Sequence, residues 1–187
     1  MMSEITKRAL SESLKKLLSE KPLDKITVTD LVNDCGVNRQ TFYYHFQDLY
    51  DLVEWTCLED ADKALQDRKT YSTWQEGFLS IFNLMKKDEP FIMNIYHSVS
   101  LDQLELYLYK LVYPLLIGVV NEQAQGMSVR EEDKAFIADF YKYAFVGLVL
   151  DWIKRGMKDD PQLIIDRLSI LIKGTIPQAL ENYRLDK

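Results

Sequence analysis

A short stretch of the sequence, RQTFYYH at residues 39–45, carries side chains that are well suited to binding nucleic acid. Phe42 and Phe46 are four residues apart, so on a helix they share one face, and we expect both to point into a core. The other positions then face outward: Arg39, Gln40, Thr41, Tyr43, Tyr44 and His45. Arginine and glutamine can hydrogen-bond base edges, while threonine, tyrosine and histidine can hydrogen-bond phosphate. Each residue alone is better explained by packing or solvation, so the prediction depends on the joint pattern.

Two short helices joined by a glycine turn would hold these side chains in place. Thr27 with Asp30 three residues later is typical of a helix N-cap, and an apolar helical face follows. Gly36 would end this helix, and Asn38 would cap the next one. Residues 27–46 therefore predict a helix-turn-helix.

The segment 6–53 resembles the DNA-binding domain of the TetR family of bacterial transcriptional regulators. The resemblance rests on the threonine-initiated helix, the Gly-Val turn and the sequence TFYYHF after GVNRQ. It implies a three-helix DNA-binding domain at residues 1–47, with Thr27 bonded to a phosphate. Gln47 and Leu49 depart from the pattern, because these regulators often carry lysine there. The resemblance implies that these residues bind DNA: Thr27, Thr29, Asn38, Arg39, Gln40, Thr41, Tyr43, Tyr44 and His45.

The charge is distributed unevenly along the 187 residues, which carry a net charge of −6. Residues 1–47 hold seven Lys/Arg and six Asp/Glu, a net charge of +1, so the remainder carries −7. This fits a near-neutral DNA-binding segment on an acidic body that phosphate would repel. We expect few phosphates to be neutralised and a shallow dependence of DNA affinity on salt.

Several classes of protein are disfavoured by the sequence. It has no run of about 18 apolar residues and no hydrophobic N-terminal signal segment, so we expect a cytoplasmic protein that does not span a membrane. Two cysteines and two histidines without ligand spacing predict no metal site, and we expect no cofactor. Neither a phosphate-binding loop nor a nucleophile elbow is present, so we expect no enzymatic activity.

The rest of the chain predicts an all-α fold of about nine helices, with a regulatory and dimerisation domain at residues 48–187. Almost no strand pattern is present, and 47% of the residues are apolar. Pro114 is expected to kink or break its helix, and the final helix is expected to run from Pro161 past Ile176. Capping patterns predict helices that begin near Asp48, Ser72, Ser100, Ser128 and Asp160.

The helix expected at residues 129–154 is apolar on more than one face in its second half, AFVGLVLDWI, and therefore needs partners on two sides. TetR-family proteins dimerise through their last two long helices, so the resemblance implies a homodimer. Gly147 and Gly174 would allow close helix approach there, or would serve packing inside one protomer. The implied interface residues are Phe140, Ala144, Gly147, Leu148, Trp152, Leu168, Leu171 and Ile172.

A second, looser resemblance covers residues 140–161, FYKYAFVGLVLDWIKRGMKDDP. This segment is similar to the DhaS-like regulators of dihydroxyacetone kinase operons. Some members of that subgroup partner a dihydroxyacetone-kinase-like protein, so the resemblance leaves open a protein co-regulator as well as a small molecule.

Regulators of this family usually hold an inducer among the helices of the body, where tyrosine, tryptophan and histidine supply apolar walls with polar tips. The competing interpretation, which we favour from sequence, is that the aromatic residues fill the core. The candidate ligand-binding residues are Trp55, Phe78, Phe82, Tyr96, His97 and Tyr107.

The sequence thus predicts a regulator that binds palindromic operator DNA as a homodimer and responds to an effector or partner at its C-terminal domain. The alternative is a protein-interaction co-regulator with weak or lost sequence-specific DNA binding.

Overall fold

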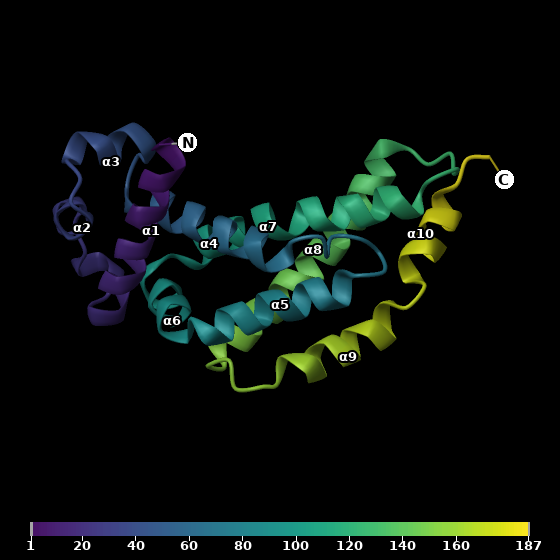
Figure 1. Ribbon diagram of the computed structural model, residues 1–187. Coiled ribbons are helices and arrows are strands. Elements are labelled where there is room, and N and C mark those ends of the chain that lie inside the picture. Colours follow the sequence, from purple (N-terminus) through teal and green to yellow (C-terminus); the bar gives the residue numbers. More distant parts are fainter. Residues whose placement is uncertain (1, 187) are drawn as a thin grey trace. The chain divides into compact units, whose positions relative to one another are not determined.

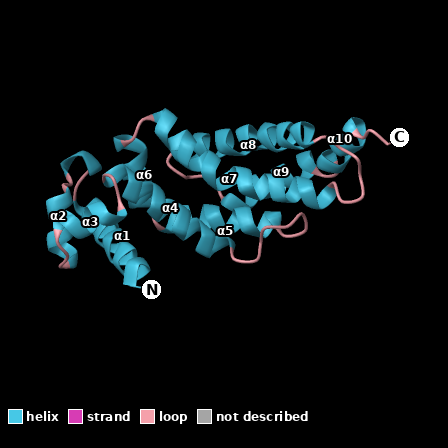
Figure 2. Cartoon of the chain, turned by 90° about the horizontal axis from the view of Figure 1, so that it is seen from above, coloured by secondary structure: helices cyan, strands magenta, loops and turns pink. Residues whose placement is uncertain are grey.

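The computed structural model describes residues 2–186, and over that range the chain is helical without strands (Figures 1 and 2). The all-α fold, with an N-terminal helix-turn-helix and a C-terminal helical domain, is confirmed. The helices are α1 (Met2–Glu20), η1 (Leu23–Lys25), α2 (Val28–Cys35), α3 (Arg39–His45), α4 (Leu49–Leu65), α5 (Trp74–Lys87), α6 (Glu89–Ser98), α7 (Leu101–Gln123), α8 (Glu131–Lys154), α9 (Pro161–Ile172) and α10 (Thr175–Tyr183).

The chain divides into two compact units. The N-terminal unit comprises Met1–Asp60 and Asp88–Leu104, and the C-terminal unit comprises Ala61–Lys87 and Glu105–Lys187. The N-terminal unit is thus larger than residues 1–47, because α6 packs on α1. Asn94 of α6 fixes this contact, since its Nδ2 donates to the carbonyls of Leu18 (2.9 Å) and Lys21 (3.1 Å) at the end of α1. These bonds satisfy carbonyls that a helix end leaves without partners.

The helix-turn-helix forms where the capping residues predict it. Thr27 and Asp30 make a reciprocal capping box at the start of α2, which satisfies two amides that the helix itself cannot. Gly36 ends α2 with a φ of 70°, a conformation that glycine adopts at no steric cost. Asn38 then caps α3 by accepting a 2.7 Å hydrogen bond from the amide of Thr41. The two helices are therefore closed off by side chains that lie within three residues of their ends.

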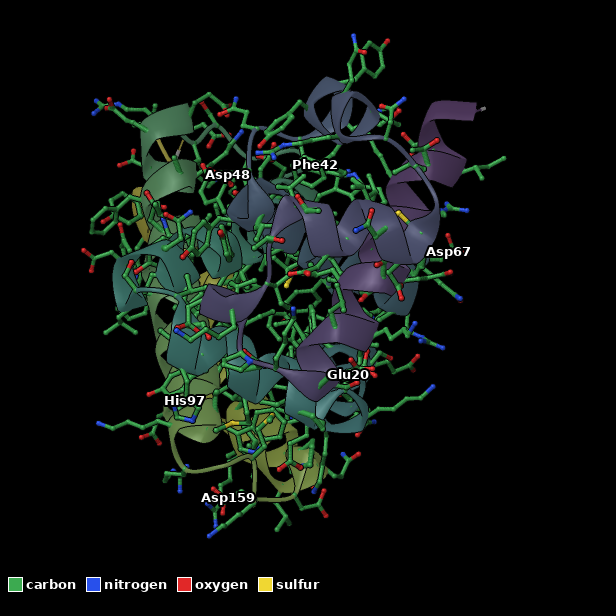
Figure 3. All side chains as sticks on the ribbon, turned by 90° about the vertical axis from the view of Figure 1, so that its left-hand side faces the viewer. Glu20, Phe42, Asp48, Asp67, His97 and Asp159 are labelled. Atoms are coloured by element: carbon green, nitrogen blue, oxygen red, sulfur yellow. The ribbon has the colours of Figure 1, made fainter. Side chains whose placement is uncertain are left out.

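Apolar side chains from α1, α2 and α3 form the core behind the helix-turn-helix. Phe42, labelled in Figure 3, is fully buried, and Phe46 is 3% exposed. Leu10 and Leu14 of α1 and Leu31 of α2 are likewise fully buried. Burying side chains of this size contributes about 1.5–3 kcal/mol each to stability, so this cluster stabilises the packing of α3 against α1 and α2. The predicted inward face of α3 is confirmed.

In the C-terminal unit, α5 runs alongside α9, and α8 packs against α10 (Figure 1). Trp152 of α8 is fully buried, and its ring lies 4.9 Å from that of Phe82 of α5, centroid to centroid. The Trp152 Nε1 donates a 3.0 Å hydrogen bond to the carbonyl of Asp159, in the turn before α9. Because its polar atom is satisfied, this tryptophan can serve as a central core residue.

The structure corrects two predictions about helix continuity, since Pro114 does not break its helix and the final helix is interrupted. Pro114 lies inside α7, which continues through it to Gln123. Pro114 is exposed, so the carbonyl that loses its amide partner lies on the side of the helix that water reaches. The final helix is not continuous, because Gly174 takes a φ of 72° and separates α9 from α10. Two short helices therefore replace the expected single one.

By length and mean hydropathy alone, α7 is the one described helix that could cross a membrane. Its buried side chains in the C-terminal unit are Tyr107, Val112, Leu116, Val119 and Val120. A core helix of a folded domain can have the same length and mean hydropathy. The buried apolar stripe of α7 is typical of such a helix.

Candidate nucleic-acid interface and effector cavity

The outward face of α3 carries most of the side chains expected to contact DNA. Arg39, Gln40, Tyr43 and Tyr44 are exposed, whereas Thr41 and His45 are half-buried. Tyr44 is 81% exposed, which is unusual for so large a ring and is not required by packing. The α3 surface therefore presents two aromatic hydroxyls, a guanidinium and an amide side by side.

Arg39 and Tyr43 hold each other in position on this face. The Arg39 Nη2 donates to the Tyr43 hydroxyl at 3.2 Å, and the guanidinium carbon lies 5.6 Å from the centroid of the Tyr43 ring. The Tyr43 ring also meets the buried Phe42 ring edge-on at 5.3 Å. Because contacts limit the motion of both side chains, less conformational entropy is lost when they bind a ligand.

Arg39 is also the one cation among the described residues 2–47 without a carboxylate within ion-pair distance. Lys16 pairs with Asp34, and Lys21 pairs with Asp30 at 2.9 Å. The other pairs are Lys7 with Glu4, Arg8 with Glu59, Lys15 with Asp60 and Asp88, and Lys25 with Asp24. The guanidinium on the recognition face is therefore the charge of this segment that can bind an external anion without giving up an ion pair.

Two of the acids that pair with these cations, Asp30 and Asp34, have lowered pKa values. The hydrogen bond from Lys21, with those from the amide and hydroxyl of Thr27, lowers the pKa of Asp30 to about 2. A hydrogen bond from Lys16 likewise lowers the pKa of Asp34. At neutral pH both lysines are therefore partly neutralised, which agrees with the expected shallow dependence on salt.

Two of the predicted DNA-binding residues, Thr27 and Asn38, also serve as helix caps. The Thr27 hydroxyl accepts from the Asp30 amide at 3.1 Å and donates to the Asp30 carboxylate at 2.9 Å. The Asn38 side-chain oxygen accepts from both the amide and the hydroxyl of Thr41, which leaves the Asn38 amide group to donate elsewhere. Thr29 is exposed on α2. Thr27 and Asn38 are thus fixed by their capping bonds before any ligand arrives.

The C-terminal unit contains a cavity of about 450 Å³, a size common for small-molecule sites. Its walls come from α5, α7, α8, α9 and α10, together with the end of α4 and the segment that follows it. Phe78, Leu116 and Phe145 contribute apolar surface, while Arg68 and Lys173 bring positive charge. The structure thus differs from the filled core that we favoured from sequence.

Of the six candidate ligand-binding residues, Phe78 lines this cavity and the others do not. Phe82 packs on Trp152, and Tyr107 is 4% exposed. The remaining three belong to the N-terminal unit: Trp55 lies against Phe46 at 5.9 Å, Tyr96 is half-buried, and His97, labelled in Figure 3, is exposed.

The cavity cations Arg68, Lys69 and Lys173 were not among the candidates. No local pattern reveals them, because residues from about 65 to 176 contribute to one wall only after the helices have packed. Arg68 and Lys69 lie just beyond α4, and Lys173 lies just beyond α9. A cation that directly follows a helix is only weak evidence for a binding site, since its favourable interaction with the helix dipole also explains this position.

Comparisons with known proteins agree on one family. Residues 12–54 match the model of bacterial regulatory proteins of the tetR family, and residues 72–174, more than half of the chain, match the model of a transcriptional regulator C-terminal region. This chain belongs to the TetR family. It is a transcriptional regulator and not an enzyme.

This TetR-family chain is similar to the HTH-type dhaKLM operon transcriptional activator DhaS of Lactococcus lactis subsp. lactis (strain IL1403). The two sequences are 24% identical over 160 residues, which is 82% of each chain. A solved structure described as dihydroxyacetone kinase operon activator DhaS has a TM-score of 0.69 at 21% identity, covering 96% of this chain and 98% of that one. The expected similarity to the DhaS-like subgroup is confirmed.

Two solved repressors share the fold at lower identity. The TetR family repressor AlkX from Dietzia sp. strain DQ12-45-1b has a TM-score of 0.61 at 16% identity, covering 93% of this chain and 96% of that one. NalD of Pseudomonas aeruginosa, the secondary repressor of the MexAB-OprM multidrug efflux pump, has a TM-score of 0.56 at 14% identity, covering 99% and 100%. Both activators and repressors are therefore among the similar proteins.

In this TetR-family regulator, α8 carries an exposed apolar stripe. Phe140 is 63% exposed, Leu148 is 41% exposed, and Ala144 and Gly147 lie between them on the same open face. Phe136 and Tyr143, which we did not predict, extend the stripe and are 63% and 56% exposed. Helical spacing places all six on one side of α8. Large apolar side chains gathered in this way are typical of an interaction surface.

The other four residues expected at the dimer interface differ in their exposure. Leu171 of α9 is 72% exposed and can reach a partner, whereas Ile172 is half-buried and lines the cavity. Trp152 and Leu168 are 0% and 7% exposed within the protomer, so they belong to its core. Their assignment to the dimer surface was wrong because α8 and α9 each have one apolar face directed into their own unit.

Proposed function

We propose that this protein binds palindromic operator DNA as a homodimer through α3. The observation that carries the proposal is Arg39, the unpaired cation of residues 2–47, exposed beside Tyr43 on α3. A guanidinium can bond guanine bidentately in the major groove, and the adjacent Gln40 can do the same with adenine. Exposed tyrosine hydroxyls would bond phosphate and set the register. As a regulator of bacterial genes, it would act in the cytoplasm.

The homodimer is supported by the exposed stripe on α8 and by Leu171 on α9. A two-fold interface places the same patch on both subunits, so apolar side chains such as Phe140 would pack against their own copies or near neighbours. A Cβ atom added at Gly147 would meet nothing within 4 Å beyond its own stretch of α8, so this face is open to close approach by a second helix. Two copies of α3 about 34–36 Å apart would then read half-sites one helical turn apart.

Control by an effector would work through a shift between two dimer geometries. α9 contributes Ser169 and Ile170 to the cavity wall and carries Leu171 on its exposed side, so a ligand in the cavity contacts the helix that also bears an interface residue. A ligand that favours one arrangement of α9 would change the spacing of the two α3 helices. A ligand with equal affinity for both arrangements would change nothing.

The test is selection of bound duplexes from a random library, with the mass of the protein in solution measured on the same sample. We expect a dimer and an enriched palindrome with half-sites about one helical turn apart. Enrichment of a single half-site by a monomer would contradict the homodimer. No enrichment by a folded dimer would favour the alternative, a protein-interaction co-regulator without sequence-specific DNA binding.

A protein co-regulator in place of a small molecule is the second candidate for the control step. It is suggested by similarity to the DhaS-like subgroup and by the extension of the apolar stripe to Phe136, near the start of α8. A dimer that fails to select DNA alone but selects the palindrome with cell extract added would favour it.

A further inference from the structure

The cavity of the C-terminal unit combines apolar walls with positive charge. The C-terminal unit, residues 61–87 and 105–187, holds sixteen Lys/Arg and fifteen Asp/Glu, a net charge of +1. The described residues that line the cavity include three cations, Arg68, Lys69 and Lys173, and neither aspartate nor glutamate. If the lining had the average composition of this unit, it would include aspartate or glutamate as well. The lining therefore concentrates positive charge within a nearly neutral unit, and such a site attracts anions.

The three cations differ in how far they are already paired. Lys69 is committed to Asp62, with Nζ 2.6 Å from the carboxylate. The Arg68 Nε lies 3.6 Å from a carboxylate oxygen of Glu76, a side chain that is 71% exposed, and such an exposed contact contributes little. Lys173 has no carboxylate within ion-pair distance among the described residues. Lys173 and Arg68 are therefore the groups that can turn to an incoming anion.

Arg68 is also held at the cavity by neutral contacts. Its Nη1 donates a 3.0 Å hydrogen bond to Ser80 Oγ of α5 and lies 3.5 Å from the carbonyl oxygen of Ala64. Guanidinium has five N–H donors, so these bonds leave others free. The side chain can thus keep its anchor on α5 while it bonds an anion.

The apolar walls of the cavity favour a ligand that carries an apolar group as well as an anionic one. The Phe78 and Phe145 rings lie 4.4 Å apart, and the Trp74 ring meets Phe145 edge-on at 5.9 Å. Leu116 and Ile176 extend the apolar surface. A small inorganic anion would leave this surface in contact with water, whereas a neutral apolar molecule would leave the cations unused.

We propose that this cavity binds a small molecule with one anionic group, a carboxylate or a phosphate, on an apolar body. Lys173 and Arg68 bind the anionic group, and the aromatic cluster of Trp74, Phe78 and Phe145 contacts the body. The inference rests on the proposed function only in making this molecule the effector, because its binding can be measured without DNA.

Calorimetry on the full chain with four matched probes tests the class of ligand. The probes are 2-naphthoate, 2-naphthyl phosphate, neutral 2-naphthalenemethanol and cationic 2-naphthylmethylammonium. We expect one saturable site per protomer and affinities for at least one of the two anions about tenfold or more above that for the alcohol, since a charged hydrogen bond contributes about that factor. The better of the two anions identifies the head group. Equal affinity for anion and alcohol, or a preference for the cation, would overturn the proposal.

Two variants assign the effect to the cavity. Lys173→Gln should remove most of the preference for the anion and leave affinity for 2-naphthalenemethanol unchanged. Lys154→Gln is the matched control, because Lys154 is exposed on the same unit and does not line the cavity. Lys173→Glu should reverse the preference toward 2-naphthylmethylammonium. An anion preference that persists in Lys173→Glu would place the binding elsewhere and overturn the assignment.

Operator binding, measured by fluorescence anisotropy on the selected duplex, separates this inference from the proposed function. A protein that binds the duplex but shows no anion preference retains the proposed function and refutes the inference. A protein that binds 2-naphthoate in the expected manner but selects no DNA refutes DNA recognition and supports the cavity assignment.

Discussion

Arg39 and Tyr43 lie one helical turn apart on α3, and the guanidinium donates a 3.2 Å hydrogen bond to the Tyr43 hydroxyl. The pair is exposed, yet the Tyr43 ring rests edge-on against the fully buried Phe42. An exposed pair that is anchored on the core in this way has a defined position relative to the fold. The two side chains can therefore bind DNA as a unit. Replacing one should change the contribution of the other to the free energy of binding.

Replacing Tyr43 with alanine should weaken operator binding by about 1–3 kcal/mol, the scale of one good specific contact. The variant loses the hydroxyl and also releases Arg39 from its neighbour. Fluorescence anisotropy with the selected duplex measures the dissociation constant. Tyr183→Ala serves as the control, because Tyr183 is comparably exposed but lies at the end of α10 in the C-terminal unit. Unchanged affinity in a folded Tyr43 variant would remove this residue from the interface.

The local structure of the helix-turn-helix could be predicted because its determinants are close together in sequence. Thr27 with Asp30 and Asn38 with Thr41 make their capping bonds across three residues. The inward face of α3 follows from helical periodicity alone. The ion pairs that leave Arg39 unpaired could not be predicted, since Arg8 with Glu59 and Lys15 with Asp88 join residues that are distant in sequence.

The C-terminal unit was harder to predict because α8 is apolar on two faces. Periodicity identifies such faces but does not tell which one is buried in the protomer. Phe140 and Trp152 are twelve residues apart, which places them about 120° apart around a helix. Leu148 of the same exposed stripe is only four residues, or about 40°, from Trp152, so the exposed and buried faces adjoin and the angles alone did not assign them. The cavity had no signal in the sequence, because its walls come from six helices and the segments that join them.

Replacing Thr27 with alanine should lower the free energy of unfolding by about 1 kcal/mol, within the range for loss of an N-cap. The hydroxyl accepts from the Asp30 amide and donates to its carboxylate, so both bonds are lost. Chemical denaturation followed by circular dichroism measures the change. Thr27→Ser keeps the hydroxyl and should remain close to the wild type. Equal losses in both variants would show that the methyl group and not the cap is responsible.

Stability should fall between about pH 4 and pH 2 in part because of Asp30. Its pKa is lowered from 3.8 to about 2 in the folded protein, mainly by the hydrogen bond from Lys21. A folded-state pKa below the unfolded value stabilises the protein above the unfolded pKa, and this contribution is lost as the pH falls through the folded one. Asp30→Asn should therefore be less stable than wild type at pH 6, and the difference should shrink toward pH 2.

Urea unfolding of wild type and Asp30→Asn at pH 6, 4, 3 and 2.5 measures this difference. Asp24→Asn is a suitable control, since Asp24 makes an exposed 3.3 Å pair with Lys25 and no capping bond. We expect the Asp24 variant to follow the wild type more closely across the range. A difference for Asp30→Asn that stays constant from pH 6 to 2.5 would show that the carboxylate charge is not what stabilises the cap.

Replacing Phe140 with glutamate should separate the dimer into monomers. The change places a carboxylate at the centre of the exposed stripe of α8, and two-fold symmetry introduces it twice. An unpaired charge buried in an interface costs about 3 kcal/mol or more, which is over a hundredfold in the dissociation constant. Analytical ultracentrifugation over a range of concentrations measures it. Operator affinity should fall together with dimerisation, because a monomer engages one half-site.

Leu106→Glu provides the matched control for Phe140→Glu. Leu106 is 51% exposed, but it lies on α7 and outside the stripe that runs from Phe136 to Leu148 on α8. Since the substitution adds the same charge to a similarly exposed position, it should leave the dimer intact. Dissociation by Leu106→Glu with an intact Phe140→Glu dimer would move the interface to α7. The stripe on α8 would then be free to bind a protein co-regulator.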